Sequence, residues 1–231
     1  MKKYFALGMA VIMIAAAALT TVPPANAQGA GLVSSIFNKM ERNRRDLRSL
    51  RAGISMEKYN AQIKDTDKRT GTVLYLPGAG RNAFVRVDWK SPVQETLAVA
   101  DGQYTLFSPR RNTAWVGATS SKNAKVSSVL GFGLNASAAQ LKSSFDVQDV
   151  YDETLWGGVA TYHMKLVPKG SASFQYEEIW VDGTGMPIQT KVIEKNGDST
   201  TVRLMNVERN AQVAKSDFKL DLGSDVKKLR G

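Results

Sequence analysis

The chain has 231 residues, no cysteine and a formal net charge of +10 at pH 7, from 31 basic and 21 acidic side chains. The lack of cysteine excludes disulfides, thiolate catalysis and the lipid anchor that bacterial lipoproteins carry on a cysteine. The basic excess suits anionic lipid head groups or an acidic protein partner.

Residues 1–27 have the features of a secretory signal peptide. Lys2-Lys3 precedes an uncharged run over residues 4–22, and Ala25-Asn26-Ala27 forms an A-x-A cleavage pattern. An uncleaved membrane anchor is the weaker interpretation, because polar residues interrupt the run and two prolines end it. We expect residues 28–231, with a net charge of +8, to form one exported soluble domain that does not bind nucleic acid.

An amphipathic helix is predicted from Gly31 to about Leu50. Apolar residues recur there at helical spacing: Leu32, Val33, Ile36, Phe37, Met40, Leu47 and Leu50. The other face is basic and carries Lys39, Arg42, Arg44, Arg45 and Arg48. That face is either a docking surface for a membrane or an acidic partner, or an ordinary solvated helix face, which is the commoner role of such charge runs.

Period-two alternation predicts six strands in the first half of the chain. They fall at Ser49–Lys64, Gly71–Leu76, three consecutive strands within Phe84–Ser108, and Thr113–Gly117. Asp65-Thr66-Asp67-Lys68 is predicted as the first turn. Within the three-stranded meander, Ser91-Pro92 and Asp101-Gly102 mark the turns, because proline cannot donate to a ladder and Asp-Gly favours two-residue hairpins.

The strand pattern stops between Ser120 and Ser144. This stretch is rich in Ser, Ala, Lys and Gly, and we predict two short helices separated around Gly131–Asn135. Helices inserted in the middle of a sheet protein suggest a lid over an open end or face.

Five further strands are predicted in the second half of the chain. Their ranges are Phe145–Tyr151, Val159–Val167, Phe174–Val181, Pro187–Glu194 and Ser199–Val207, which brings the total to about eleven. Glycine-containing turns separate them, and the tail from Lys215 is expected to pack as an extended segment. No linker or solenoid repeat divides the chain, so one mainly β domain is predicted.

Recognisable catalytic chemistry is sparse. His163 is the only histidine, and without a paired ligand or base it is more often incidental than functional. Glu177 and Glu178 are adjacent on a strand and point to opposite faces, so they cannot act together on one substrate. Gly131–Ala136 formally matches G-x-G-x-x-A but lacks a βαβ context, and no Walker A motif occurs. We therefore expect no enzyme activity, no metal and no cofactor.

Several strands place large apolar residues on one face. We predict that the face is built from Val85, Val87, Trp89, Leu97, Val99, Tyr162, Met164, Leu166, Phe174 and Trp180, with Val129, Leu130 and Phe132 from the lid. Such a face is either an ordinary core filled by its own side chains or the wall of a lumen for an apolar ligand. The helical insertion favours the lumen, because a filled barrel needs no lid.

Short motifs follow one another along the whole mature chain. They include Arg86–Pro92 (RVDWKSP), Val99–Gly102 (VADG), Tyr162–Lys169 (YHMKLVPK), Ile179–Asp182 (IWVD), Ile188, Val207–Asn210 and Asp217-Phe218. In this order and spacing they resemble the LolA family, periplasmic carriers of outer-membrane lipoproteins. The resemblance implies an unclosed antiparallel β half-barrel of about eleven strands with an N-terminal helix and a helical lid.

The resemblance also implies a function, a compartment and partners. A monomeric periplasmic chaperone would bind the acyl chains of lipoproteins in its hydrophobic cavity. It would receive them from an inner-membrane ATP-dependent lipoprotein transporter and pass them to an outer-membrane lipoprotein acceptor. The chain has no ATP site of its own, so a partner must drive the extraction.

One position departs from the family pattern. The family has an arginine before the proline that ends its second strand, and that arginine holds the lid closed. Here Leu76 stands before Pro77. Arg81 or Arg86 is the candidate replacement, as a latch or a partner contact.

Three rival functions remain open from the sequence. One is a regulatory module on the same fold that senses lipid or lipoprotein and signals to a membrane protein. A second is a carrier of another lipid. The third is a hydrolase that uses His163 or a carboxylate.

Overall fold

The computed structural model describes residues 25–78, 83–119 and 137–231. Four groups of predicted features therefore lie outside the described residues. These are most of the signal peptide, Arg81, the first predicted lid helix, and the lid residues Val129, Leu130 and Phe132.

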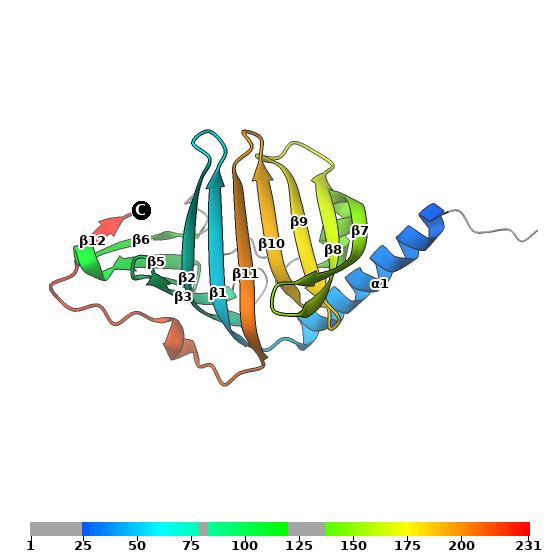
Figure 1. The fold of residues 1–231 in the computed structure, drawn as a ribbon. Coiled ribbons are helices and arrows are strands. Elements are labelled where there is room, and N and C mark those ends of the chain that lie inside the picture. Colours follow the sequence, from blue (N-terminus) through cyan, green and yellow to red (C-terminus); the bar gives the residue numbers. More distant parts are fainter. Residues whose placement is uncertain (1–24, 79–82, 120–136) are drawn as a thin grey trace, which may run out of the picture.

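Twelve strands of the described chain form one sheet (Figure 1). Their order across the sheet is β12-β6-β5-β4-β3-β2-β1-β11-β10-β9-β8-β7, so β12 and β7 are the edges and the sheet does not close. All neighbours are antiparallel except β12 and β6, which are parallel. The bounds are β1 Leu50–Asn60, β2 Asp65–Pro77, β3 Ala83–Ser91, β4 Glu95–Ala100, β5 Gln103–Ser108, β6 Thr113–Ala118, β7 Phe145–Leu155, β8 Val159–Pro168, β9 Phe174–Asp182, β10 Pro187–Glu194, β11 Ser199–Arg209 and β12 Lys227–Arg230.

Two α-helices accompany the sheet in the described chain. The long helix α1 (Ala25–Asp46) lies behind the sheet in Figure 1, beside β7 and β8. The short helix α3 (Ala138–Ser144) directly precedes β7 and begins with a capping box between Ser137 and Gln140. Two 3₁₀ turns, η1 (Pro109–Arg111) and η2 (Lys215–Phe218), complete the described elements.

The meander predicted between Phe84 and Ser108 is confirmed as β3, β4 and β5. Asp101 and Gly102 form the two-residue hairpin turn, with φ angles of 49° and 76°. Positive φ at both turn residues matches the right-handed twist of the flanking strands. Proline at position 92 follows the last residue of β3, as its missing donor requires.

Three predicted boundaries were wrong. The turn expected at residues 65–68 is part of β2, which pairs with β1 from Asp65↔Asn60 onward, so the turn lies at residues 61–64. Residues 65–68, at that end of the hairpin, are all polar and exposed, so no alternation of apolar and polar residues identifies them as a strand. Helix α1 begins and ends several residues earlier than predicted. It ends earlier because Leu50 already pairs with Tyr75 and Arg209 in the sheet.

The sheet has two chemically different faces. We call the face that carries Val87, Leu97 and Val202 the inner face and the opposite one the outer face. Registers align inner-face side chains across strands, as in Val73↔Val87 and Val87↔Leu97. Helix α1 packs on the inner face at β8 and β9, where Met164 and Ile179 are fully buried.

The turn between β9 and β10 docks α1 on the sheet. Gly185 has a φ of +89°, and a Cβ there would lie 2.3 Å from the backbone carbonyl of Lys39. The Asp182 carboxylate accepts hydrogen bonds from the backbone N–H groups of Thr184 and Met186, and Asn43 of α1 donates to the Met186 sulfur. Only glycine allows this approach of turn and helix backbone.

Gly185→Ala is therefore expected to lower the free energy of unfolding by about 3 kcal/mol, through the positive φ and the backbone overlap. Urea denaturation measures the loss. Gly183→Ala is the matched control, since Gly183 lies in the same turn and no atom lies within 4 Å of the position that its new methyl group would take. Equal stability of the two variants would contradict the docking role of Gly185.

Candidate functional site

The inner face carries the largest apolar cluster of the described chain. Its principal members come from β1 to β5, β10 and β11, and are Leu50, Ile54, Met56, Val73, Tyr75, Val85, Val87, Trp89, Leu97, Val99, Tyr104, Leu106, Ile188, Val202 and Leu204. Ala83, Trp115 and Val207 are half-buried and pack against the margin of this cluster. We call the buried members the inner-face cluster and the three half-buried residues its margin.

Five of the predicted lumen residues belong to the inner-face cluster. They are Val85, Val87, Trp89, Leu97 and Val99, and none is more than 5% exposed. The structure therefore brings the β3 and β4 residues together as predicted, with their side chains covered. Any apolar ligand must displace contacts that these side chains already make.

Three other predicted lumen residues lie under α1. Met164 and Leu166 of β8 are buried in a second cluster that includes Ile36, Phe37 and Met40 of the helix. Tyr162 packs against the same cluster and receives a hydrogen bond from the Lys39 ammonium at 3.4 Å. The helix thus occupies the part of the inner face that β8 and β9 provide.

Trp180 was predicted on the inner face and instead projects from the outer face. It is nevertheless buried and belongs to the same connected group of buried apolar residues as Val87. It pairs in register with His163, not with Met164, so its indole projects from the outer face. The indole N–H donates to the Glu153 carboxylate at 2.8 Å, and the ring lies 4.8 Å from the His163 ring. Phe174, at the start of β9, stacks on Phe145 at 6.4 Å and belongs to neither buried cluster.

Arg86 also lies on the outer face. Its guanidinium binds the Asp88 carboxylate at 2.9 Å and donates to the backbone carbonyl of Asp217 at 3.0 Å. Beside it, Phe84 packs against Phe218 of η2, with ring centroids 5.7 Å apart. Arg86 therefore anchors the C-terminal segment, and a latch over the inner face would have to come from elsewhere.

A buried carboxylate closes one end of the inner-face cluster. Glu95 lies opposite Trp89 and is 3% exposed. It accepts a hydrogen bond from Arg69 at 2.9 Å and forms a second ion pair with Arg111 at 3.5 Å. At another position of the cluster, burial raises the pKa of Tyr75 to about 12, so its phenol stays neutral.

Glu177 is a carboxyl group in apolar surroundings on the inner face. Its register partners are Leu166 on β8 and Val192 on β10, and burial raises its pKa to about 7. The group is therefore largely protonated below neutral pH and can then donate a hydrogen bond. Sequence reasoning considered Glu177 only as part of a carboxylate pair and missed this environment.

The raised pKa of Glu177 makes folding stability depend on pH. Its stabilising contribution is complete below the unfolded pKa of about 4.5 and is lost as pH rises through about 7. Relative to Glu177→Gln, the free energy of unfolding of the wild type is expected to fall by roughly 2 kcal/mol between pH 4 and pH 8. Denaturant titrations across this range test it. Glu208→Gln, which changes a carboxylate that is 56% exposed, should retain the wild-type dependence on pH.

Glu41 connects α1 to α3. Its carboxylate accepts hydrogen bonds from Arg44 at 2.6 Å and 3.1 Å, from the Ala138 backbone N–H at 3.3 Å and from Arg45 at 3.2 Å. The Arg44 guanidinium, with the other donors, lowers the pKa of Glu41 to about 2. The carboxylate thus holds the first turn of α3 against the C-terminal part of α1.

His163 lies among aromatic and polar neighbours, and its Nε2 is 3.7 Å from the Glu178 carboxylate. Its ring is buried on the outer face between Tyr151, at 4.5 Å, and Trp180. Its Nδ1 lies 3.2 Å from the carbonyl oxygen of Asp149. Among the described residues no three His, Asp or Glu side chains are grouped so as to hold a metal ion.

Sequence reasoning missed most of the inner-face cluster outside β3 and β4. The alternation of Ile54 with Met56, and of Val202 with Leu204, was the available signal. It identifies residues that share a face but does not place that face next to Val87.

Comparison with known proteins extends the sequence evidence. Residues 57–221 match the model of the family described as the outer membrane lipoprotein carrier protein LolA. A search of curated proteins found no match. No helix in the described ranges combines the length and hydropathy that crossing a bilayer requires.

Three solved structures have similar folds. An uncharacterized conserved protein from Thermus thermophilus is 12% identical with a TM-score of 0.54, covering 87% of this chain and 99% of its own. The Pseudomonas aeruginosa MucA/MucB complex gives 15% identity and a TM-score of 0.52 over 84% of this chain and 62% of that chain. LprF from Mycobacterium bovis gives 10% identity and a TM-score of 0.50 over 84% and 98%. At such low identity these matches show a shared fold.

Proposed function

Since this chain belongs to the family of the outer membrane lipoprotein carrier protein LolA, we propose that it is a periplasmic lipoprotein carrier. Residues 28–231 act as the carrier domain after removal of the signal peptide. The acyl chains of the cargo bind at the inner-face cluster. The observation that carries the proposal is a continuous apolar inner face on a sheet whose edges do not meet.

The inner-face cluster suits hydrocarbon cargo energetically. Burial of one long acyl chain is worth on the order of 12 kcal/mol, at about 0.8 kcal/mol per CH₂. Hydrocarbon needs neither hydrogen-bond partners nor charges from its site, and the cluster offers an apolar surface over most of its area. Met56 adds a flexible side chain that can adapt to chains of different shape.

Cargo entry must separate side chains that are now in contact. Val87 and Leu97 are almost completely covered, whereas Trp115 and Val207 at the margin keep part of their surface accessible. We place the first contact with cargo at these marginal residues. The cost of opening explains why an ATP-dependent transporter at the inner membrane would load the carrier and an acceptor at the outer membrane would unload it.

The experiment that tests the carrier role is lipoprotein release from spheroplasts. Purified residues 28–231, added outside the spheroplasts, should release lipoproteins into the soluble fraction in an ATP-dependent manner. Wild-type protein that releases none, although folded, would contradict transport between membranes.

A second candidate is a regulatory module that binds a membrane protein segment. It is favoured by the likeness to MucB, which was solved in complex with MucA, although this chain covers only 62% of that MucB chain. A stable complex with a membrane protein segment, recovered by crosslinking from intact cells and formed without lipoprotein release, would establish this role instead.

A further inference from the structure

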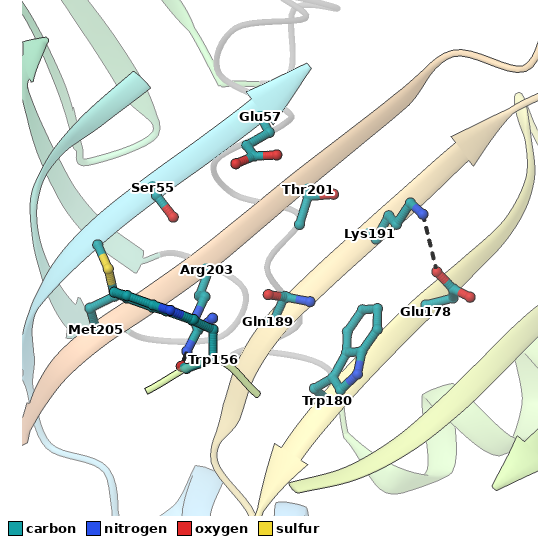
Figure 2. Close-up of a pocket in the computed structure, with 10 residues that line it drawn as sticks. All are labelled: Ser55, Glu57, Trp156, Glu178, Trp180, Gln189, Lys191, Thr201, Arg203 and Met205. Atoms are coloured by element: carbon teal, nitrogen blue, oxygen red, sulfur yellow. Dashed lines mark hydrogen bonds and ion pairs between the residues drawn. The ribbon is translucent and has the colours of Figure 1, made fainter. Parts of the chain in front are cut away.

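The outer face carries a pocket of about 540 Å³ that the acyl-binding proposal does not use (Figure 2). It crosses four adjacent strands, β1, β11, β10 and β9. Its lining residues are Ser55, Glu57, Trp156, Glu178, Trp180, Gln189, Lys191, Thr201, Arg203 and Met205. Pockets that hold small organic ligands have volumes of roughly 300–1,000 Å³, so its size suits a ligand of two sugar rings.

The β7–β8 hairpin supplies one wall of this pocket. Its turn places Trp156 beside the outer face of β11, where Figure 2 shows the indole next to Arg203 and Met205. The Arg203 guanidinium donates to the Trp156 carbonyl, and it lies 6.0 Å from the centre of the indole ring. Gly157 and Gly158 follow with φ angles of 88° and 79°, so the turn needs both glycines.

Trp156 presents most of its aromatic surface to solvent. Its side chain is 84% exposed, more than any other large hydrophobic residue of the described chain. An exposed indole on a fixed turn offers a flat apolar surface for stacking. Burial of that surface by a ligand would remove it from water.

The polar lining is made of side chains and is balanced in charge. Two acids, Glu57 and Glu178, stand with two bases, Lys191 and Arg203, and Lys191 pairs with Glu178 at 3.8 Å. Gln189 adds both an amide donor and a carbonyl acceptor. The four strands lie inside the sheet, so their backbone groups are used in ladders and cannot bind a peptide backbone as an added strand.

We propose that this outer-face pocket binds a neutral saccharide. The apolar face of a sugar ring stacks on Trp156, and its hydroxyl groups exchange hydrogen bonds with Gln189, Glu178 and Lys191. A balanced set of donors and acceptors beside an aromatic surface matches a ligand that has many hydroxyl groups, an apolar ring face and no net charge. Arg203 is a positioning residue, because it holds the hairpin that carries Trp156.

Titration of ¹⁵N-labelled protein with cellobiose, maltose and N,N′-diacetylchitobiose tests the proposal by NMR. We expect at least one of them to shift the Trp156 indole N–H signal with a millimolar Kd. Trp156→Ala and Gln189→Ala should each weaken binding about tenfold or more, equivalent to about 1.4 kcal/mol. Ile63→Ala removes an exposed apolar side chain outside the pocket and should leave the affinity unchanged.

Three outcomes would overturn the saccharide assignment. In the first, none of the three sugars shifts signals of the pocket residues. In the second, sugar binding is equally strong in Trp156→Ala, whose folding is verified by its remaining spectrum. In the third, a neutral tetrapeptide shifts the pocket signals and the sugars do not, which identifies a peptide site. None of these results depends on acyl-chain binding at the inner face.

Discussion

Replacement of Trp115 by glutamate is expected to weaken acyl-chain binding by at least about tenfold. Trp115 is half-buried on β6 and packs against the inner-face cluster, opposite Leu106. The nearby cation is Arg111, whose guanidinium lies 5.1 Å from the centre of the Trp115 ring and already pairs with Glu95. A second carboxylate would therefore gain little from it and would lose water beside hydrocarbon, at a cost of several kcal/mol. Displacement of a fluorescent fatty acid measures the affinity.

Val116→Glu provides the matched control. Val116 is the next residue of β6, is also half-buried, and faces the outer side because successive strand residues alternate. It should bind the fatty acid with wild-type affinity. An equal loss in both variants would mean that binding does not depend on the inner face.

Glu95→Ala is expected to lower the free energy of unfolding by about 3 kcal/mol. The substitution leaves Arg69 and Arg111 without their shared buried partner, and removing one member of a buried ion pair typically costs about 3–5 kcal/mol. Arg111 is well exposed and recovers part of its hydration, so we place the loss at the lower end of that range. Urea denaturation at neutral pH measures it.

The control for this variant is Asp67→Ala. Asp67 pairs with the same Arg69 at 3.6 Å, but it is 53% exposed, and exposed pairs contribute about 0–1 kcal/mol. It should change stability by less than about 0.5 kcal/mol. Comparable effects of the two substitutions would show that burial of Glu95 does not determine its contribution.

The strands and the central meander could be predicted because their signals are local. Alternation of Val85, Val87 and Trp89 identifies a strand, and Asp101-Gly102 identifies its following turn, without knowledge of distant residues. The order of those signals also permitted recognition of the family. Eleven predicted strands accordingly correspond to eleven of the twelve in the described sheet.

The composition of the candidate site could not be predicted as well, because it depends on register between strands. Alternation shows that Met164 and Leu166 share a face, and that Tyr176 and Trp180 share a face. It does not show that β8 and β9 align Met164 with Ile179 and His163 with Trp180. This register puts Trp180 on the outer face.

Long-range contacts also decided the roles of α1 and Arg86. The apolar stripe of the helix was visible in the sequence, but its position over β8 depends on the glycine turn at Gly185. Arg86 was considered for its charge alone. Its partner, the carbonyl of Asp217, is 131 residues away and carries no sequence signal.

Acyl-chain binding at the inner face can be examined without any added probe, by mass spectrometry of the protein purified from its own cells under conditions that preserve complexes. We predict a bound acylated lipoprotein or lipid in wild-type protein and in Val116→Glu, and its absence from Trp115→Glu. Wild-type protein that carries no acylated ligand, and takes up none when mixed with a purified triacylated lipoprotein, would contradict binding at the inner-face cluster.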